Sequence, residues 1–171
     1  RTDTATVSVQ VVPPPAAHFN PPPGTLFTHP FRKGKRKLIR KQIIKTIKSV
    51  LYGGQIRIAS WSFSRKAYRK ALNQARKRGV SVQIVLAGRN NKHNSDWRRL
   101  VKAFGKNKAA GSWVMRCKKS CRGVKGTQHS KMFLFSQAYQ TRWVTMTGSA
   151  NLTDFAVTGQ SVLSDASFRE A

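Results

Sequence analysis

The sequence is short of acidic residues. It holds 33 lysines and arginines but only five aspartates and glutamates, and its formal net charge is +28. No carboxylate occurs between Asp3 and Asp96. Mechanisms built on paired carboxylates, such as glycoside hydrolysis, are therefore disfavoured, and so are carboxylate-rich Mg²⁺ or Ca²⁺ sites. We expect neither a metal ion nor another cofactor.

Long apolar runs and metal-ligating side chains are scarce too. No segment approaches the roughly 20 apolar residues that a membrane-spanning helix needs. A structural zinc site needs four ligands. The sequence has only two cysteines, Cys117 and Cys121 in "CKKSC", and its few histidines are scattered, so a zinc site is not indicated. This pair predicts a small disulfide loop, with two free thiols as the alternative. A disulfide favours an oxidising compartment, so we expect a secreted, extracellular protein.

Positive charge is what the chain has in excess. A potential of this sign attracts polyanions such as nucleic acid, and also anionic lipid surfaces. The alternative is a solvated basic surface that keeps the protein soluble. At +28 on 171 residues we expect an anionic surface or polyanion as partner or substrate.

The prolines divide the chain unevenly. Six of the seven fall at 13–15 and 21–23, which predicts residues 1–30 as an extended Pro-rich leader or linker. Residues 31–171 are then expected to form one domain, since their length and apolar content suit a single core.

Apolar periodicity predicts the elements of that domain. Residues 35–54 place apolar side chains on one side and basic ones on the other, which is typical of a surface helix. "QIRIASWSF" then alternates at period two as a strand does, and residues 65–79 and 80–88 repeat the helix–strand order. This order predicts an α/β fold with a mixed, mainly parallel sheet flanked by helices. Another helix is expected at 95–105, and further strands at "GSWVMRC", "KMFLFS" and "RWVTMTG", the last two joined by the turn-like "QAYQT".

Four polar residues lie at the ends of the last two of these strands. His129 and Lys131 precede "MFLF", and side chains two apart in an extended segment project to the same face. Ser149 and Asn151 stand in "GSAN" at the end of the next strand. An imidazole can attack phosphorus or protonate a leaving oxygen, a lysine can stabilise the charged transition state, and Ser and Asn can bind phosphate oxygens. The alternative is that these are ordinary polar residues at strand ends.

"HSK" before a hydrophobic strand, with "GSAN" downstream, resembles the phospholipase D superfamily signature, HxKxxxxD followed by GSxN. The likeness covers most of residues 35–155. Within the superfamily, the sequence is similar to secreted bacterial phospholipase D-like proteins. This resemblance implies one lobe of that fold, with His129 as the nucleophile that forms a phosphohistidine, or as the acid partner to one. It also implies that Lys131, Ser149 and Asn151 bind the phosphate. Ser136 departs from the pattern, because it stands where the family has the aspartate that usually supports the site.

The resemblance further implies an active site made from two HxK motifs, contributed by two lobes or by two identical subunits. This chain has one, because no lysine stands two residues after His18, His29 or His93. Only 20 residues follow Asn151, too few for a second lobe. We therefore expect either a homodimer or a C-terminally truncated chain whose second lobe is missing.

Three functions follow from these features. The resemblance favours a phospholipase D-type hydrolase that cleaves a phospholipid head group through a phosphohistidine. The charge favours a metal-independent endonuclease of the same superfamily, so the substrate is a phospholipid or a nucleic-acid phosphodiester. The third alternative is a non-catalytic module that binds polyanions with its lone motif.

Overall fold

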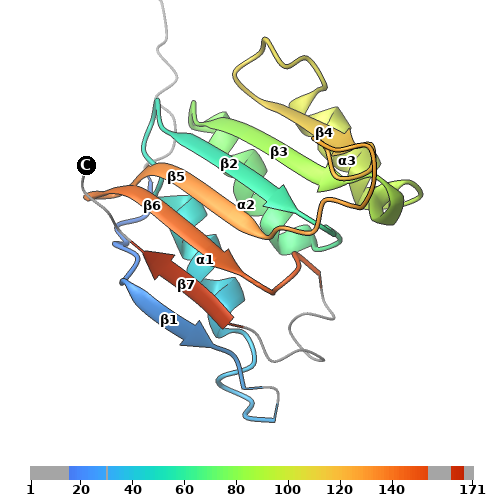
Figure 1. Cartoon of the computed structure of the whole chain (residues 1–171). Coiled ribbons are helices and arrows are strands. Elements are labelled where there is room, and N and C mark those ends of the chain that lie inside the picture. The colour runs from blue at the N-terminus through green and yellow to red at the C-terminus, as the bar shows by residue number, and fades with distance from the viewer. Residues whose placement is uncertain (1–15, 30, 154–162, 168–171) are drawn as a thin grey trace, which may run out of the picture.

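The computed structural model describes residues 16–29, 31–153 and 163–167 (Figure 1). These residues form β1 (Gly24–Phe27), α1 (Leu38–Ser49), β2 (Gln55–Ser60), α2 (Lys66–Lys77), β3 (Ser81–Ala87), the 3₁₀ turn η1 (Arg89–Asn91), α3 (Ser95–Phe104), β4 (Trp113–Cys117), β5 (Met132–Ala138), β6 (Thr141–Gly148) and β7 (Leu163–Ser167). All strands belong to one sheet in the order β1-β7-β6-β5-β2-β3-β4. No helix in the described part of the chain is long and apolar enough to cross a membrane.

The sheet is mixed, and the predicted α/β class is confirmed. Strands β2, β3 and β4 are parallel, whereas the other four neighbouring pairs are antiparallel. The expectation of a mainly parallel sheet is therefore wrong. Tyr139 and Gln140 are the only residues between β5 and β6, and a link this short permits an antiparallel hairpin but no parallel crossover. The hairpin also makes β5 run against β2.

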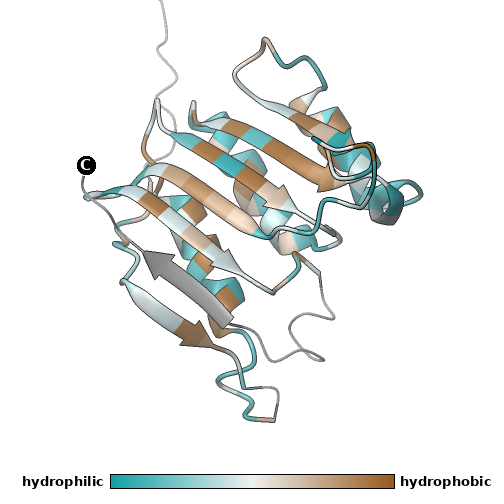
Figure 2. Ribbon diagram, viewed as in Figure 1, coloured by the Kyte–Doolittle hydropathy of each residue, from teal (hydrophilic) through white to brown (hydrophobic). Residues whose placement is uncertain are grey.

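The helices α1 and α2 cover one face of the sheet, behind it in Figure 1, and the core lies between them and the strands. The predicted helix periodicity is confirmed by Ile39, Ile43 and Ile47, which α1 buries against the sheet. Figure 2 shows apolar and polar residues alternating along the strands. In β2, for example, Ile56 and Ile58 are buried while the residues between and before them are more exposed. The opposite face of the sheet is only partly covered.

Part of the predicted leader packs against the domain. The Ala17 N–H donates to the Lys48 carbonyl at 3.0 Å, and the ring of His18 stacks on Tyr139 at 4.6 Å between centroids. Residues 24–27 form the edge strand β1, which pairs with β7. The sheet therefore includes residues that the sequence assigns to the leader. Residues 1–15, which hold the first proline cluster, lie outside the described residues, and so do 154–162 and 168–171 of the predicted domain.

A disulfide joins Cys117 to Cys121, as the sequence predicts. It closes a short loop at the end of β4, next to the end of β3. A Cβ atom on Gly88 would overlap the carbonyl oxygen of Cys117, so glycine is what allows these two strand ends to approach. The disulfide loop is therefore fixed to the sheet at its base.

Arg78 is a buried cation that stabilises the end of α1. It is 6% exposed, and its Nη2 donates to the carbonyls of Ile47, Lys48 and Val50 at 3.1 to 3.4 Å. These carbonyls belong to the last turn of a helix, where the helix itself supplies no donor. Burial lowers the pKa of the Arg78 guanidinium from its ordinary value.

We expect Arg78→Met to lower the free energy of unfolding by about 3 kcal/mol, because the buried carbonyls of Ile47 and Val50 would lose this donor. Urea unfolding followed by circular dichroism measures the change. The matched control is Arg76→Met, since Arg76 is exposed two residues before Arg78, and it should change stability by less than about 0.5 kcal/mol. Equal losses in the two variants would show that the carbonyl contacts contribute nothing.

Candidate active site

Three strand ends meet where the sequence predicts the phosphate site. The Gly148 N–H donates to the Lys131 carbonyl at 3.2 Å, which places the end of β6 beside the start of β5. The segment after β2 is attached to the segment after β6 by Leu152, whose N–H donates to the Ser62 carbonyl at 3.3 Å and whose carbonyl accepts from the Ser64 N–H at 3.0 Å. The HxK and GSxN motifs are thus neighbours in space, joined through backbone hydrogen bonds.

His129 and Lys131 contact each other directly. The Lys131 Nζ lies 3.1 Å from His129 Nε2 and donates to the His129 carbonyl at 2.7 Å. A protonated lysine can only donate, so with Lys131 in that form Nε2 is the acceptor of this contact. Lys131 is 6% exposed, and burial lowers its pKa below the ordinary lysine value, whereas His129 is exposed. The His129 side chain is therefore accessible to a substrate, with the Lys131 ammonium beside its Nε2.

Trp61 is a third member of the cluster. Its ring meets the His129 ring edge to face at 4.9 Å between centroids, and the Lys131 Nζ lies 5.5 Å from its ring centroid. A cation at this distance from an indole is attracted by the ring. Trp61 thus restricts both side chains of the HxK motif. Sequence reasoning missed this role, because the contact depends on β2 and β5 being neighbours in the sheet.

Asn91 holds the segment that carries Trp61. It is completely buried, and its Nδ2 donates to the carbonyls of Trp61 at 2.9 Å and Ala87 at 2.7 Å. Its Oδ1 accepts from the Phe63 N–H at 3.2 Å. One side chain therefore fastens the segment after β2 to the end of β3. Sequence reasoning missed Asn91 as well, since an asparagine in a polar loop carries no distinctive signal.

Ser149 and Asn151 lie on the segment that follows β6. Ser149 is exposed, and Asn151 is 8% exposed with its Oδ1 buried and unpartnered among the described residues. No hydrogen bond in the described part of the chain joins either side chain to His129 or Lys131. Buried side-chain amides normally have partners, so Asn151 retains hydrogen-bonding capacity that the fold does not use.

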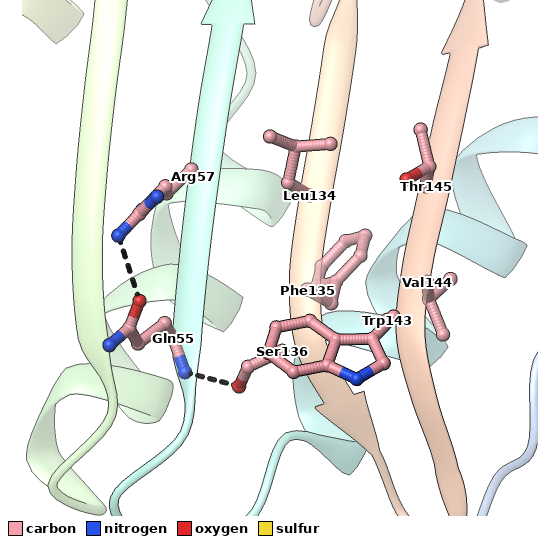
Figure 3. A pocket seen from close by; sticks show the side chains of 8 residues that line it. All are labelled: Gln55, Arg57, Leu134, Phe135, Ser136, Trp143, Val144 and Thr145. Carbon is pink, nitrogen blue, oxygen red and sulfur yellow. Dashed lines mark hydrogen bonds between the residues drawn. The ribbon is translucent and has the colours of Figure 1, made fainter. Parts of the chain in front are cut away.

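Ser136 lies at the other end of β5 from His129. Its Oγ accepts from the Gln55 N–H at 2.9 Å and so helps to join β5 to β2 (Figure 3). It lines a pocket on the open face of the sheet, beside Leu134 and the exposed Trp143. The position at which the family has aspartate is thus a structural one in this protein, and the serine still supplies an oxygen acceptor there.

The surroundings of the site are cationic. Of the five acidic side chains, the structure describes that of Asp96, which pairs with Arg69 at 3.2 Å and with Arg99 at 3.6 Å. In the ranges that the structure describes, no group of three or more His, Cys, Asp or Glu side chains could hold a metal ion. The site consists of an imidazole, an ammonium, an indole and polar groups, a set suited to a phosphate anion.

Comparison with known proteins agrees with this geometry. Residues 43–161 match the family described as "Cardiolipin synthase, PLD-like domain". The chain therefore belongs to the phospholipase D superfamily, and the predicted single lobe of that fold is confirmed. A search of curated protein sequences finds no match.

Two solved structures share the fold over nearly the whole chain. Nuc from Salmonella typhimurium, described as a phospholipase D family member, is 24% identical with a TM-score of 0.60, and the match covers 84% of this chain and 81% of Nuc. NucT from Helicobacter pylori is 18% identical with a TM-score of 0.62, and the match covers 84% of each chain. At these identities the likeness is one of fold.

Proposed function

We propose that this protein hydrolyses phosphodiesters through a covalent intermediate on His129. The observation that carries the proposal is the contact between the Lys131 Nζ and the His129 Nε2 at 3.1 Å. It places a positive charge beside the nitrogen that attacks. Nucleophilic attack on a phosphodiester anion requires such a charge to stabilise the transition state.

The proposed reaction has two steps. The Nε2 lone pair attacks phosphorus, the N–P bond forms, and the P–O bond to the leaving group breaks as that oxygen takes a proton. Water then attacks the same phosphorus and gives a proton to the acid that the first step deprotonated, and the N–P bond breaks to regenerate the neutral imidazole. Lys131 exchanges its contact with Nε2 for one with a phosphate oxygen, and Ser149 and Asn151 donate hydrogen bonds to the other oxygens.

The acid that protonates the leaving group is proposed to be a second histidine outside this chain's own motif. His18 does not serve, because it stacks on Tyr139 at the β5–β6 hairpin, the far end of β5 from His129. The exposure of His129 leaves room for a second HxK motif to face it, from another copy or from a second lobe. Sedimentation velocity on the active protein distinguishes a second copy of the chain from a second lobe, since a homodimer has twice the mass of the 19.2 kDa chain.

The substrate is proposed to be a phospholipid head group or a nucleic-acid strand, and a module that binds polyanions without turnover is the competing function. The test is an assay in EDTA of phosphatidylcholine vesicles, plasmid DNA and bis(p-nitrophenyl) phosphate. Hydrolysis of any of them in EDTA supports the proposal. Salt-sensitive binding without turnover of any would replace it with the binding module. The disulfide supports secretion into an oxidising compartment.

We expect the pH profile of kcat/KM to fall on its alkaline side because Lys131 loses its proton. Burial lowers the pKa of Lys131, so the fall begins below about pH 10.4, where a solvated lysine titrates. The protonated form is the active one, and activity is therefore lost as pH rises through this pKa. In Lys131→Arg, whose cation does not titrate in this range, the residual activity should show no such fall. An unchanged alkaline limb in that variant would assign the limb to another group.

A further inference from the structure

A second hollow lies beside the candidate active site, where the ends of β3 and β4 meet the loop before β5. It has a volume of about 460 Å³ and is lined by Gly88, Arg89, Lys119, Gly126 and Thr127. Arg89 and Lys119 are exposed cations on opposite segments of its wall. None of these five residues belongs to the HxK or GSxN motif.

The loop that carries Lys119 is tightly constrained. The Cys117–Cys121 disulfide closes it, and the Cys121 N–H donates to the Lys118 carbonyl at 3.1 Å within it. The Gln128 N–H donates to the Lys119 carbonyl at 3.1 Å, so the residue that precedes His129 is fastened to this loop. The backbone that carries Lys119 is held in this way, so it loses little freedom when the lysine meets an anion.

The cations around the hollow have no acidic partner nearby in the sequence. Lys118, Lys119, Arg122 and Lys125 are all exposed on the disulfide loop and the segment after it. No aspartate or glutamate occurs between Asp96 and Asp154. The positive field over the hollow is therefore uncompensated along this whole stretch, and it favours a multiply charged anion.

The hollow is linked to the reacting centre by a short stretch of chain. Thr127 stands two residues before His129, and two residues of extended chain span at most about 7 Å. We propose that this hollow binds the phosphate that neighbours the scissile one in a nucleic-acid strand. A phospholipid such as phosphatidylcholine carries a single phosphodiester at its head group and leaves the hollow unused, whereas a nucleic acid presents a phosphate at every nucleotide. The proposal rests on the proposed function of His129 and names its substrate class.

The test compares a polymer with a single diester. Arg89→Gln/Lys119→Gln removes both cations, and kcat/KM is measured for a single-stranded oligodeoxynucleotide and for bis(p-nitrophenyl) phosphate. The ratio of the two values should fall about tenfold or more, through a higher KM for the oligonucleotide. The slope of log K against log salt for oligonucleotide binding should flatten by about 0.7, since the contact with one phosphate is lost. The matched control is Lys106→Gln/Lys108→Gln, which removes two exposed lysines after α3 and should leave the ratio within about twofold.

Two kinetic outcomes would overturn the proposal. An unchanged ratio would show that the hollow does not touch the polymer. An equal loss on both substrates would show that the loop only positions His129.

If the wild-type protein hydrolyses neither substrate, the proposed hydrolase function fails. The proposed phosphate site in the hollow can then still be tested by measuring oligonucleotide binding. Fluorescence anisotropy with the labelled oligonucleotide on the His129→Ala protein, with and without the double substitution, should still show weaker binding. A double variant that binds the oligonucleotide normally but loses binding to phosphatidylglycerol vesicles would assign the hollow to a membrane and reject the nucleic-acid proposal.

Discussion

Replacing His129 with alanine is expected to lower kcat/KM for a phosphodiester by at least about 10³-fold, because the attacking nitrogen is lost. Lys131, Ser149 and Asn151 remain in the variant, so binding of the phosphate should persist. The KM should therefore change much less than kcat. Initial rates with bis(p-nitrophenyl) phosphate in EDTA give both constants.

The control for this variant is His93→Ala, since His93 is an exposed histidine in the loop before α3. It should leave kcat/KM within about twofold. His129 is also exposed, so its loss should change the free energy of unfolding by less than about 0.5 kcal/mol. A His129→Ala protein that retains more than a tenth of the activity would contradict the assignment of the nucleophile.

Replacing Asn91 with alanine is expected to lower the free energy of unfolding by about 3 kcal/mol and also to lower kcat. Two buried backbone groups, on Phe63 and Ala87, and the partly buried Trp61 carbonyl would lose their hydrogen bond to Asn91, and each unpaired buried group costs about 1–3 kcal/mol before relaxation. Trp61 would then be less restrained against His129 and Lys131. Urea unfolding gives the stability, and the pH profile of kcat/KM shows whether the alkaline limb assigned to Lys131 has moved.

Asn73→Ala is the matched control, because Asn73 is half-buried on α2, away from the segment after β2. It should change stability by less than about 1 kcal/mol and leave the pH profile unchanged. If Asn91→Ala lost stability but kept the wild-type kcat and pH profile, Asn91 would have a structural role alone.

Much of the fold can be predicted because its helices and strands have clear apolar periods. The alternation in "QIRIASWSF" predicts β2, and the amphipathic patterns on either side predict α1 and α2. Strand direction is harder, since it depends on which strands become neighbours. The short link at Tyr139 and Gln140 identifies the hairpin, yet nothing local shows that β5 pairs with β2 rather than with β4.

Some residues of the candidate site can be predicted from the sequence, and others are found only in the structure. His129, Lys131, Ser149 and Asn151 stand in two short motifs, so their spacing along the chain is enough to find them. Trp61 and Asn91 act through contacts between segments about 30 to 70 residues apart in sequence, which only the register of the sheet creates. The unpartnered Oδ1 of Asn151 is likewise visible only once the burial of each atom is known.

The most direct test of the account is to trap the covalent intermediate. The protein is mixed with a diester substrate in EDTA and quenched in alkali, where a phosphorus–nitrogen bond on histidine survives, and its peptides are weighed by mass spectrometry. The account predicts that the peptide with residues 126–136 carries the phosphoryl half of the substrate on His129, and that the adduct is absent from His129→Ala. Turnover with no adduct, or an adduct on another residue, would contradict it.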